Sequence, residues 1–155
     1  MKPKFAALRR EQIDGQLAPL RRVRLTHPTR GWVRAIREAL GINGSQLARR
    51  LKIARSHLSQ IEDAESSGAI SMQTLKKAAA ALGCELVYAL VPRNGKTLEE
   101  MVKYRAQQVA ERMVNNVAGT MALEDQAVSG RFKKREIDRL AAELVRTLPK
   151  DLWDE

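Results

Sequence analysis

Residues 46–62 constrain the fold of this chain most strongly, because two apolar stripes lie on either side of a short turn. Leu47 and Leu51 lie one helical turn apart in the first half of the stretch. Leu58 and Ile61 lie three residues apart in the second half, so each half would offer one apolar face to a shared core. The polar residues left facing outward are Arg55, Ser56, His57, Ser59 and Gln60. The pattern predicts two helices crossing over a tight turn, and it makes these outward residues candidates for reading DNA bases.

The stretch resembles the Cro-and-repressor type (XRE) helix-turn-helix family, and the resemblance covers about residues 31–82. The family pattern is Gln-x-x-Leu-Ala-x-x-Leu, a turn, and then Ser-x-x-Ile-Ser-x-Ile-Glu, which this chain nearly matches. Gly44 stands where the family often has a phosphate-binding Gln, and Lys52 replaces the usual turn glycine, so we expect a slightly strained turn. We predict DNA contacts at Arg49, Arg50, Arg55, Ser56, His57, Ser59 and Gln60.

Positive charge is concentrated in the same half of the chain. Residues 1–60 hold 14 Lys and Arg against three acidic residues, a net charge of +11. Residues 61–155 hold 14 basic and 15 acidic residues, a net charge of −1, which completes the total of +10. Such a field favours binding to a phosphate backbone, although charge alone would not distinguish DNA from RNA or anionic lipid. It argues against the alternative, a helical hairpin whose polar face is only solvated.

The composition favours one modest core with appended helices, since 44% of the 155 residues are hydrophobic and 30% are charged. The single cysteine, Cys84, cannot form an internal disulfide, and we expect it to be a small buried apolar residue. His27 and His57 are too few and too separated for a recognisable metal site. No signal peptide opens the chain, and the interrupted apolar region 78–92 falls short of a membrane span, so we expect a cytoplasmic protein.

The residues before the motif predict a helix over 4–17, followed by a basic run at 21–24. This arm could follow DNA phosphates, or it could pack its apolar stripe on a core with its arginines solvated. A further helix is expected over residues 32–40. The family resemblance implies that Arg37 on this helix pairs with Glu62, in a structural role.

Residues 84–92 predict a strand, because Val, Tyr and Leu are frequent in this short run and a proline closes it. A single strand leaves its backbone groups unpaired, and the sequence shows no second convincing strand within the chain. We therefore expect the same strand of another copy to be its partner, which would give a two-stranded ribbon across a dimer axis.

The C-terminal residues predict two helices. Thr97 and Glu100 form a capping box that opens a long helix to about residue 127. Its methionines could fill a core or form an adaptable face for another protein. A basic patch at 131–135 leads into a final helix that ends at Pro149. Trp153 follows in an acidic tail, where the chain's own core or a partner would have to cover it.

Thr120 and Glu124 lie one turn apart in the long helix, and their spacing resembles the inhibitory motif of antitoxins that act on Fic-fold adenylyltransferases. Asp125 departs from the Gly or Asn of that motif. The helix-turn-helix segment, the Leu-Val-Pro ending of the strand, the Met-Ala-Leu-Glu-Asp-Gln segment and the Leu-Trp-Asp-Glu tail together resemble the bacterial mobile mystery protein A family. That resemblance implies a Fic-domain partner whose phosphate-binding Arg would be occupied by Glu124, unless Glu124 is only a solvated helix carboxylate.

We therefore predict a mainly α-helical protein with one strand: an N-terminal helix and basic arm (1–30), a helix-turn-helix domain (31–83), a dimerisation strand (84–93) and a C-terminal helical region (96–155). Its expected function is that of a dimeric autorepressor that binds double-stranded DNA and also inhibits a Fic-domain partner. The alternative is a repressor whose C-terminal helices serve dimerisation only. No nucleophile with a matched base, phosphate-binding glycine loop or metal cluster is recognisable, so we expect neither catalysis nor a cofactor.

Overall fold

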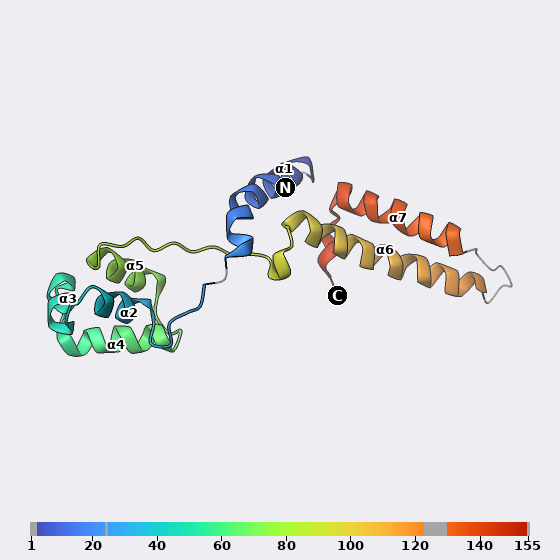
Figure 1. Cartoon of the computed structure of the whole chain (residues 1–155). Coiled ribbons are helices and arrows are strands. Elements are labelled where there is room, and N and C mark those ends of the chain that lie inside the picture. The colour runs from blue at the N-terminus through green and yellow to red at the C-terminus, as the bar shows by residue number, and fades with distance from the viewer. Residues whose placement is uncertain (1–2, 24, 123–129, 155) are drawn as a thin grey trace. The chain divides into compact units, whose positions relative to one another are not determined.

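The structure is a computed structural model that describes residues 3–23, 25–122 and 130–154. It divides into two compact units, Arg24–Ala89 and Met1–Val23 with Leu90–Glu155 (Figure 1). The first unit contains α2 (Trp32–Ala39), α3 (Gly44–Leu51), α4 (Arg55–Ser66) and α5 (Met72–Ala81). The second contains α1 (Pro3–Leu17), η1 (Ala18–Arg22), η2 (Arg93–Gly95), α6 (Leu98–Ala122), α7 (Gly130–Thr147) and η3 (Lys150–Trp153). The mainly helical fold is thus confirmed for the described residues, and none of their helices is long and apolar enough to cross a membrane.

The core of the unit 24–89 joins all four of its helices. Its buried residues are Val33, Leu47, Ala48, Leu58, Ala78 and Leu82. Ala48 on α3 and Ala78 on α5 are almost completely buried, and their short side chains allow the two helices to approach closely. The predicted stripes on either side of the turn therefore face one shared core.

The turn between α3 and α4 depends on Lys52, which ends α3 in the left-handed conformation with φ 56° and ψ 42°. Its backbone N–H continues to donate to the carbonyls of Ala48 and Arg49. The expected strain at this position is confirmed, because a residue with a Cβ pays a steric penalty in this region that glycine does not.

Replacing Lys52 with Gly should therefore stabilise the unit 24–89 by about 1 kcal/mol, since the steric penalty disappears. Lys52→Ala is the matched control, because it removes the same charge and retains the Cβ. Urea denaturation followed by Trp32 fluorescence, in a Trp153→Phe background, measures the difference. Equal stability of the Gly and Ala variants would show that the turn is unstrained.

A buried carboxylate on α4 caps the start of α2. The Glu65 carboxylate accepts hydrogen bonds from the backbone N–H groups of Trp32 at 2.8 Å and Val33 at 2.9 Å. Gly31 precedes them with φ +81°, and a Cβ built on it would lie 2.6 Å from Glu65 Oε2. Only glycine fits at this position, because both the backbone conformation and the approach of the carboxylate exclude a side chain.

A second contact between the same two helices is the predicted bridge between Arg37 and Glu62, which is confirmed. Arg37 Nε donates to Glu62 Oε1 at 2.7 Å, and Nη2 donates to Oε2 at 3.2 Å. This hydrogen-bonded partner raises the pKa of Arg37 above its ordinary value. Arg37 Nη1 also donates to the carbonyl of Ile42, so the pair holds the loop before α3 as well. Removing one member of such a poorly exposed pair is strongly destabilising, because the other charge is left without a partner.

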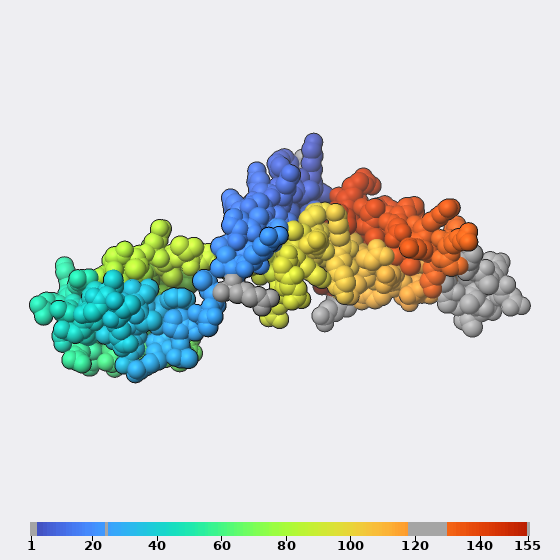
Figure 2. Space-filling view, viewed as in Figure 1, coloured from blue at the N-terminus to red at the C-terminus, as the bar shows by residue number. Residues whose placement is uncertain are grey.

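In the second unit, α6 and α7 lie side by side (Figures 1 and 2). Their shared core contains Val102, Ala106, Ala110, Ala141, Leu144 and Leu152. Leu152, on η3, is only 1% exposed, so the C-terminal turn belongs to this core. At the start of α6, Thr97 and Glu100 form the predicted capping box, with N–H to side-chain distances of 2.7 Å and 2.9 Å.

The N-terminal helix α1 contacts α6, but Phe5 and Leu8 of the apolar stripe expected to pack there are 61% and 53% exposed, so the packing alternative for the N-terminal arm holds only in part. The Asp14 carboxylate accepts hydrogen bonds from the backbone N–H groups of Leu98 at 2.8 Å and Glu99 at 3.2 Å. Arg10 Nε donates to the Glu99 carboxylate at 2.8 Å. A carboxylate at a helix N-terminus satisfies free N–H groups and complements the helix dipole, so α1 acts as a cap for α6.

Two predictions about the segment after α5 are wrong for the single chain. Residues 84–92 form neither helix nor strand, and no strand is present among the described residues. The physical reason is that the backbone groups of residues 85–91 have no partner strand among the described residues, and Cys84 N–H donates only to the carbonyl of Ala79 at the end of α5. Cys84 is exposed and not buried, because Gly83, at φ +74°, ends α5 and directs the chain away from the core.

Candidate nucleic-acid interface

Helix α4 presents one polar face outward because its other face is fixed in the core. The buried residues of α4 are Leu58, Ile61, Glu62 and Glu65. The five residues that the sequence analysis singled out on this helix are all exposed: Arg55, Ser56, His57, Ser59 and Gln60. The structure therefore brings these five together on one helix, clear of the packing side chains.

The helical periodicity of α4 shows which of these exposed residues point most directly away from the core. Successive residues of an α-helix turn by about 100°, so Ser56 and Gln60 point roughly opposite to the buried face, with Ser59 beside them. Arg55 and His57 lie at the two flanks of this face. Asp63 occupies the same outward face and is exposed, and the sequence analysis left it out. Its position three residues after Gln60 was the available signal, and a carboxylate there can accept a hydrogen bond from a cytosine amino group.

Arg55 lies close to the first residue of α3. Its Nε is 3.7 Å from where a Cβ on Gly44 would be, which is ordinary van der Waals contact. Gly44 thus leaves open the space that the longer family residue, Gln, would fill. The guanidinium lies near the start of α3, where free backbone N–H groups also favour an anion.

The two arginines of α3 differ in their surroundings. Arg50 Nη1 donates to the carbonyl of Ala81 at 3.3 Å, near the C-terminal end of α5. Arg49 is exposed and forms no ion pair among the described residues. Of the two, Arg49 is the more available for a phosphate, because Arg50 already holds an orphan carbonyl of the neighbouring helix.

The start of α3 is fixed by a capping box that the sequence analysis missed. Gln46 N donates to Asn43 Oδ1 at 2.9 Å, and Asn43 N donates to Gln46 Oε1 at 2.8 Å. The signal was an Asn followed three residues later by a Gln. The box therefore fixes the residue at which α3 begins.

Charge around α4 is positive. The unit 24–89 contains ten Lys and Arg against five Asp and Glu, a net charge of +5. Two of these five carboxylates, Glu62 and Glu65, are buried and used in structural contacts. Among the residues that the structure describes, no group of three His, Cys, Asp or Glu side chains could hold a metal ion. The accessible surface therefore suits a polyanion better than a cation.

Comparison with known proteins agrees with this geometry over part of the chain. Residues 33–88, about a third of the chain, match the family model described as "Helix-turn-helix". This segment is a helix-turn-helix domain. It makes the chain a DNA-binding transcription regulator in its broad class, with α3 and α4 as the two helices of the motif. No curated protein and no solved structure matched the chain.

The residues predicted to inhibit a Fic enzyme are placed only in part. Thr120 lies within α6, whereas Glu124 and Asp125 fall in the segment 123–129, outside the described residues. Thr120 and Glu124 are not among the residues of the nucleic-acid interface described above.

Proposed function

We propose that this protein represses its own promoter by inserting α4 into the DNA major groove at a specific operator. The observation that supports this most directly is the exposed polar face of α4, which two buried carboxylates, Glu62 and Glu65, anchor from behind. An α-helix fits the major groove, where side chains can distinguish all four base pairs. The protein then acts by occupying DNA, without a catalytic step or a cofactor of its own.

The side chains divide into base-reading and phosphate-binding roles. Arg55 and Gln60 have the groups that recognise guanine and adenine through paired hydrogen bonds. Ser56 contributes to base reading, with His57 and Ser59 on adjacent bases or phosphates. Arg49, together with Arg50 where it is released from Ala81, binds phosphates and supplies the salt-dependent part of the affinity.

Arg55→Ala should reduce discrimination between the operator and a mutated site by roughly 1–3 kcal/mol, because a bidentate contact with guanine is lost. Arg49→Ala should weaken binding to both sites alike and lower the salt dependence, as expected for a phosphate contact. Footprinting on the protein's own promoter at fixed salt measures both effects. Arg112→Ala, an exposed arginine of α6, is the matched control.

Equal binding of the operator by wild type and Arg55→Ala would contradict the base-reading role of Arg55. Uniform weakening by Arg55→Ala would instead assign its guanidinium to a phosphate, close to the start of α3 where the free protein holds it.

We propose further that the protein binds as a homodimer through residues 84–92. Val87 is 77% exposed and Leu90 is 91% exposed, which is costly for side chains of this type unless a partner covers them. Residues 85–91 also make no backbone hydrogen bond among those described. Pairing with the same segment of another copy would satisfy both needs, and a two-fold dimer matches a palindromic operator.

Val87→Pro should convert the dimer to a monomer, because proline removes a donor from the ribbon. Val87→Thr is the control, since it keeps the N–H and a β-branched shape. Sedimentation at micromolar concentration measures the change. A monomeric wild type, or a dimeric Val87→Pro variant, would contradict pairing through this segment.

The second candidate function is inhibition of a Fic-domain adenylyltransferase by the C-terminal helices. Two considerations support it: the resemblance to a Fic-associated family, and the existence of a helical unit separate from the helix-turn-helix domain. In this proposal Glu124 pairs with the Arg that would otherwise hold the nucleotide's γ-phosphate, and Thr120 precedes it by four residues in the sequence. The simpler alternative is that these helices support dimerisation only.

Glu124→Gly should release adenylylation by the bound partner while leaving promoter binding unchanged, because it removes the blocking carboxylate and no DNA-facing charge. Asp125→Gly is the matched control, since it removes a neighbouring carboxylate and restores the residue type of the motif. Nucleotide transfer by the purified Fic-domain partner in complex with each variant is the measurement. Equal activity in the wild-type and Glu124→Gly complexes would remove the inhibitory role.

A further inference from the structure

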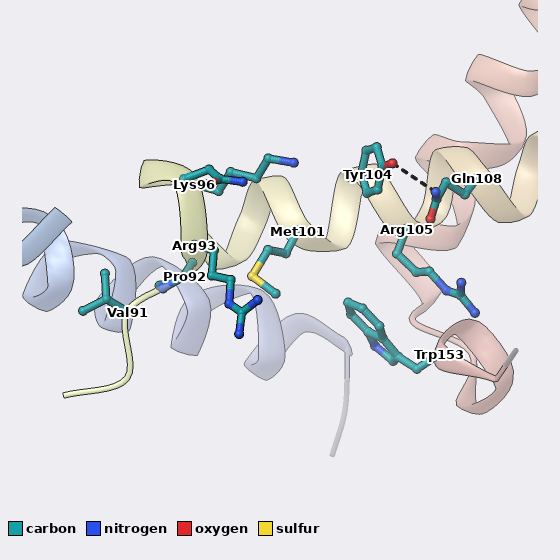
Figure 3. Close-up of a pocket in the computed structure, with 10 residues that line it drawn as sticks. Val91, Pro92, Arg93, Lys96, Met101, Tyr104, Arg105, Gln108 and Trp153 are labelled. Atoms are coloured by element: carbon teal, nitrogen blue, oxygen red, sulfur yellow. Dashed lines mark hydrogen bonds between the residues drawn. The ribbon is translucent and has the colours of Figure 1, made fainter. Parts of the chain in front are cut away.

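The second unit carries an open hollow of about 630 Å³ beside the first half of α6 (Figure 3). Three elements contribute to its lining: the segment 91–96, the exposed side of α6, and Trp153 on η3. No part of the helix-turn-helix domain belongs to it. Its volume lies in the range of ligand-binding pockets, and its shape is open to solvent, unlike an enclosed cavity.

The apolar lining of the hollow includes Met101, Tyr104 and Trp153, together with Val91 and Pro92, and Figure 3 shows Met101 extending from α6 on the side where Trp153 lies. Trp153 is 54% exposed although the preceding residue, Leu152, is almost completely buried. A tryptophan on an unstructured tail would be exposed simply because nothing holds it against the protein. This one is attached to a fixed turn and is therefore held at the surface.

Arg105 fixes that turn. Its Nε donates to the carbonyl of Leu152 at 2.7 Å, and Nη2 donates to the carbonyl of Asp154. The guanidinium thus joins α6 to the C-terminal turn and positions Trp153 as one wall of the hollow. A preformed wall lowers the entropy lost when a ligand binds against it.

The charged part of the hollow is uniformly positive. Arg93, Lys96 and Arg105 contribute cations, and no carboxylate lines the hollow among the described residues. Lys96 Nζ lies 4.6 Å from the centre of the Tyr104 ring, so this ammonium is held at the aromatic surface. Neither Arg93 nor Lys96 has an ion pair with any residue that the structure describes.

We propose that this hollow binds an acidic segment of a partner protein, with one large apolar side chain between Met101, Tyr104 and Trp153. Carboxylates flanking that side chain would pair with Arg93 and Lys96. The positive charge of the lining favours an acidic ligand. Trp, Tyr and Arg side chains that are buried from water most often dominate the binding energy of protein interfaces, and all three types line this hollow. The open shape fits one protruding side chain better than a small molecule, which a pocket usually encloses.

This inference rests on the proposed partner-binding role of the C-terminal unit and names the surface and the chemistry of the segment that it binds. It is independent of DNA reading by α4 and of the role of Glu124. If the hollow does not bind an acidic segment, promoter binding and enzyme inhibition are still tested separately, by footprinting and by nucleotide transfer.

Selection of random 12-residue peptides displayed on phage, with the full-length protein as the target, tests the proposal. The enriched peptides should share two or more carboxylates beside one Trp, Phe, Leu or Met. Synthetic copies should bind about tenfold or more weakly to Trp153→Ala and to Arg93→Glu than to wild type. Met113→Ala, an exposed α6 residue outside the hollow, is the matched control and should bind as wild type does.

Trp153 also provides a direct signal, because a Trp32→Phe variant leaves it as the only tryptophan. The selected peptide should change its fluorescence, and a version with Asp and Glu replaced by Asn and Gln should not. Promoter footprinting and thermal unfolding of each variant show that folding is retained. Lys96→Glu provides a second charge reversal if Arg93→Glu fails to fold.

Three results would overturn the proposal: no enrichment, enriched peptides without carboxylates, or equal binding to wild type and the hollow variants. A single-stranded oligothymidylate is the competing probe. If it changes Trp153 fluorescence and is displaced by none of the acidic peptides, the hollow is a nucleic-acid site and the protein-segment proposal is wrong.

Discussion

The helix-turn-helix domain depends on two carboxylates of α4 that are buried behind its outward face. Glu65 caps α2 through the N–H groups of Trp32 and Val33, and Glu62 forms the bidentate pair with Arg37. Each would be costly to bury without its partner, so together they allow few orientations of α4 against α2. The outward side chains need no contacts of their own to be held in place, which leaves Ser56, Ser59 and Gln60 available for DNA.

The same contacts determine which carboxylates of α4 face the solvent and a bound DNA. Glu62 and Glu65 lie on the buried side of the helix that faces a polyanion, and their charges are offset by Arg37 and by the N-terminus of α2. Asp63 alone projects from the outward face of α4 as a carboxylate. An acidic group there would repel phosphates and accept a hydrogen bond from a cytosine amino group, so in the proposed complex it would contribute to specificity more than to affinity.

The sequence predicted best what local pattern determines. The apolar spacing located the helices, the Thr97 and Glu100 spacing gave a cap, and the missing turn glycine indicated the strain at Lys52. The Arg37 to Glu62 pair came from the family resemblance.

Contacts between residues far apart in the sequence were not predictable from local pattern. Glu65 caps α2 by accepting from an N–H group 32 residues earlier in the chain, and Asp14 caps a helix that begins 84 residues later. The spacing of apolar residues along the sequence does not indicate contacts over such separations. The predicted strand over 84–92 is wrong because its composition favours pairing, whereas a strand also needs a neighbouring strand, and the described residues of a single chain do not provide one.

The chain passes through its second unit twice, since α1 precedes the helix-turn-helix domain and α6 follows it. Asp14 closes this arrangement by holding the first N–H groups of α6. The segment 84–92, proposed to pair in a dimer, and the lining of the hollow share Val91 and Pro92, so the proposed dimer pairing and the proposed docking of an acidic segment would restrain the same stretch of chain. Two binding events that restrain one segment are coupled, and the coupling is reciprocal. Partner binding at the hollow would then change the free energy of dimerisation, and through it operator occupancy, without any contact between the partner and α4.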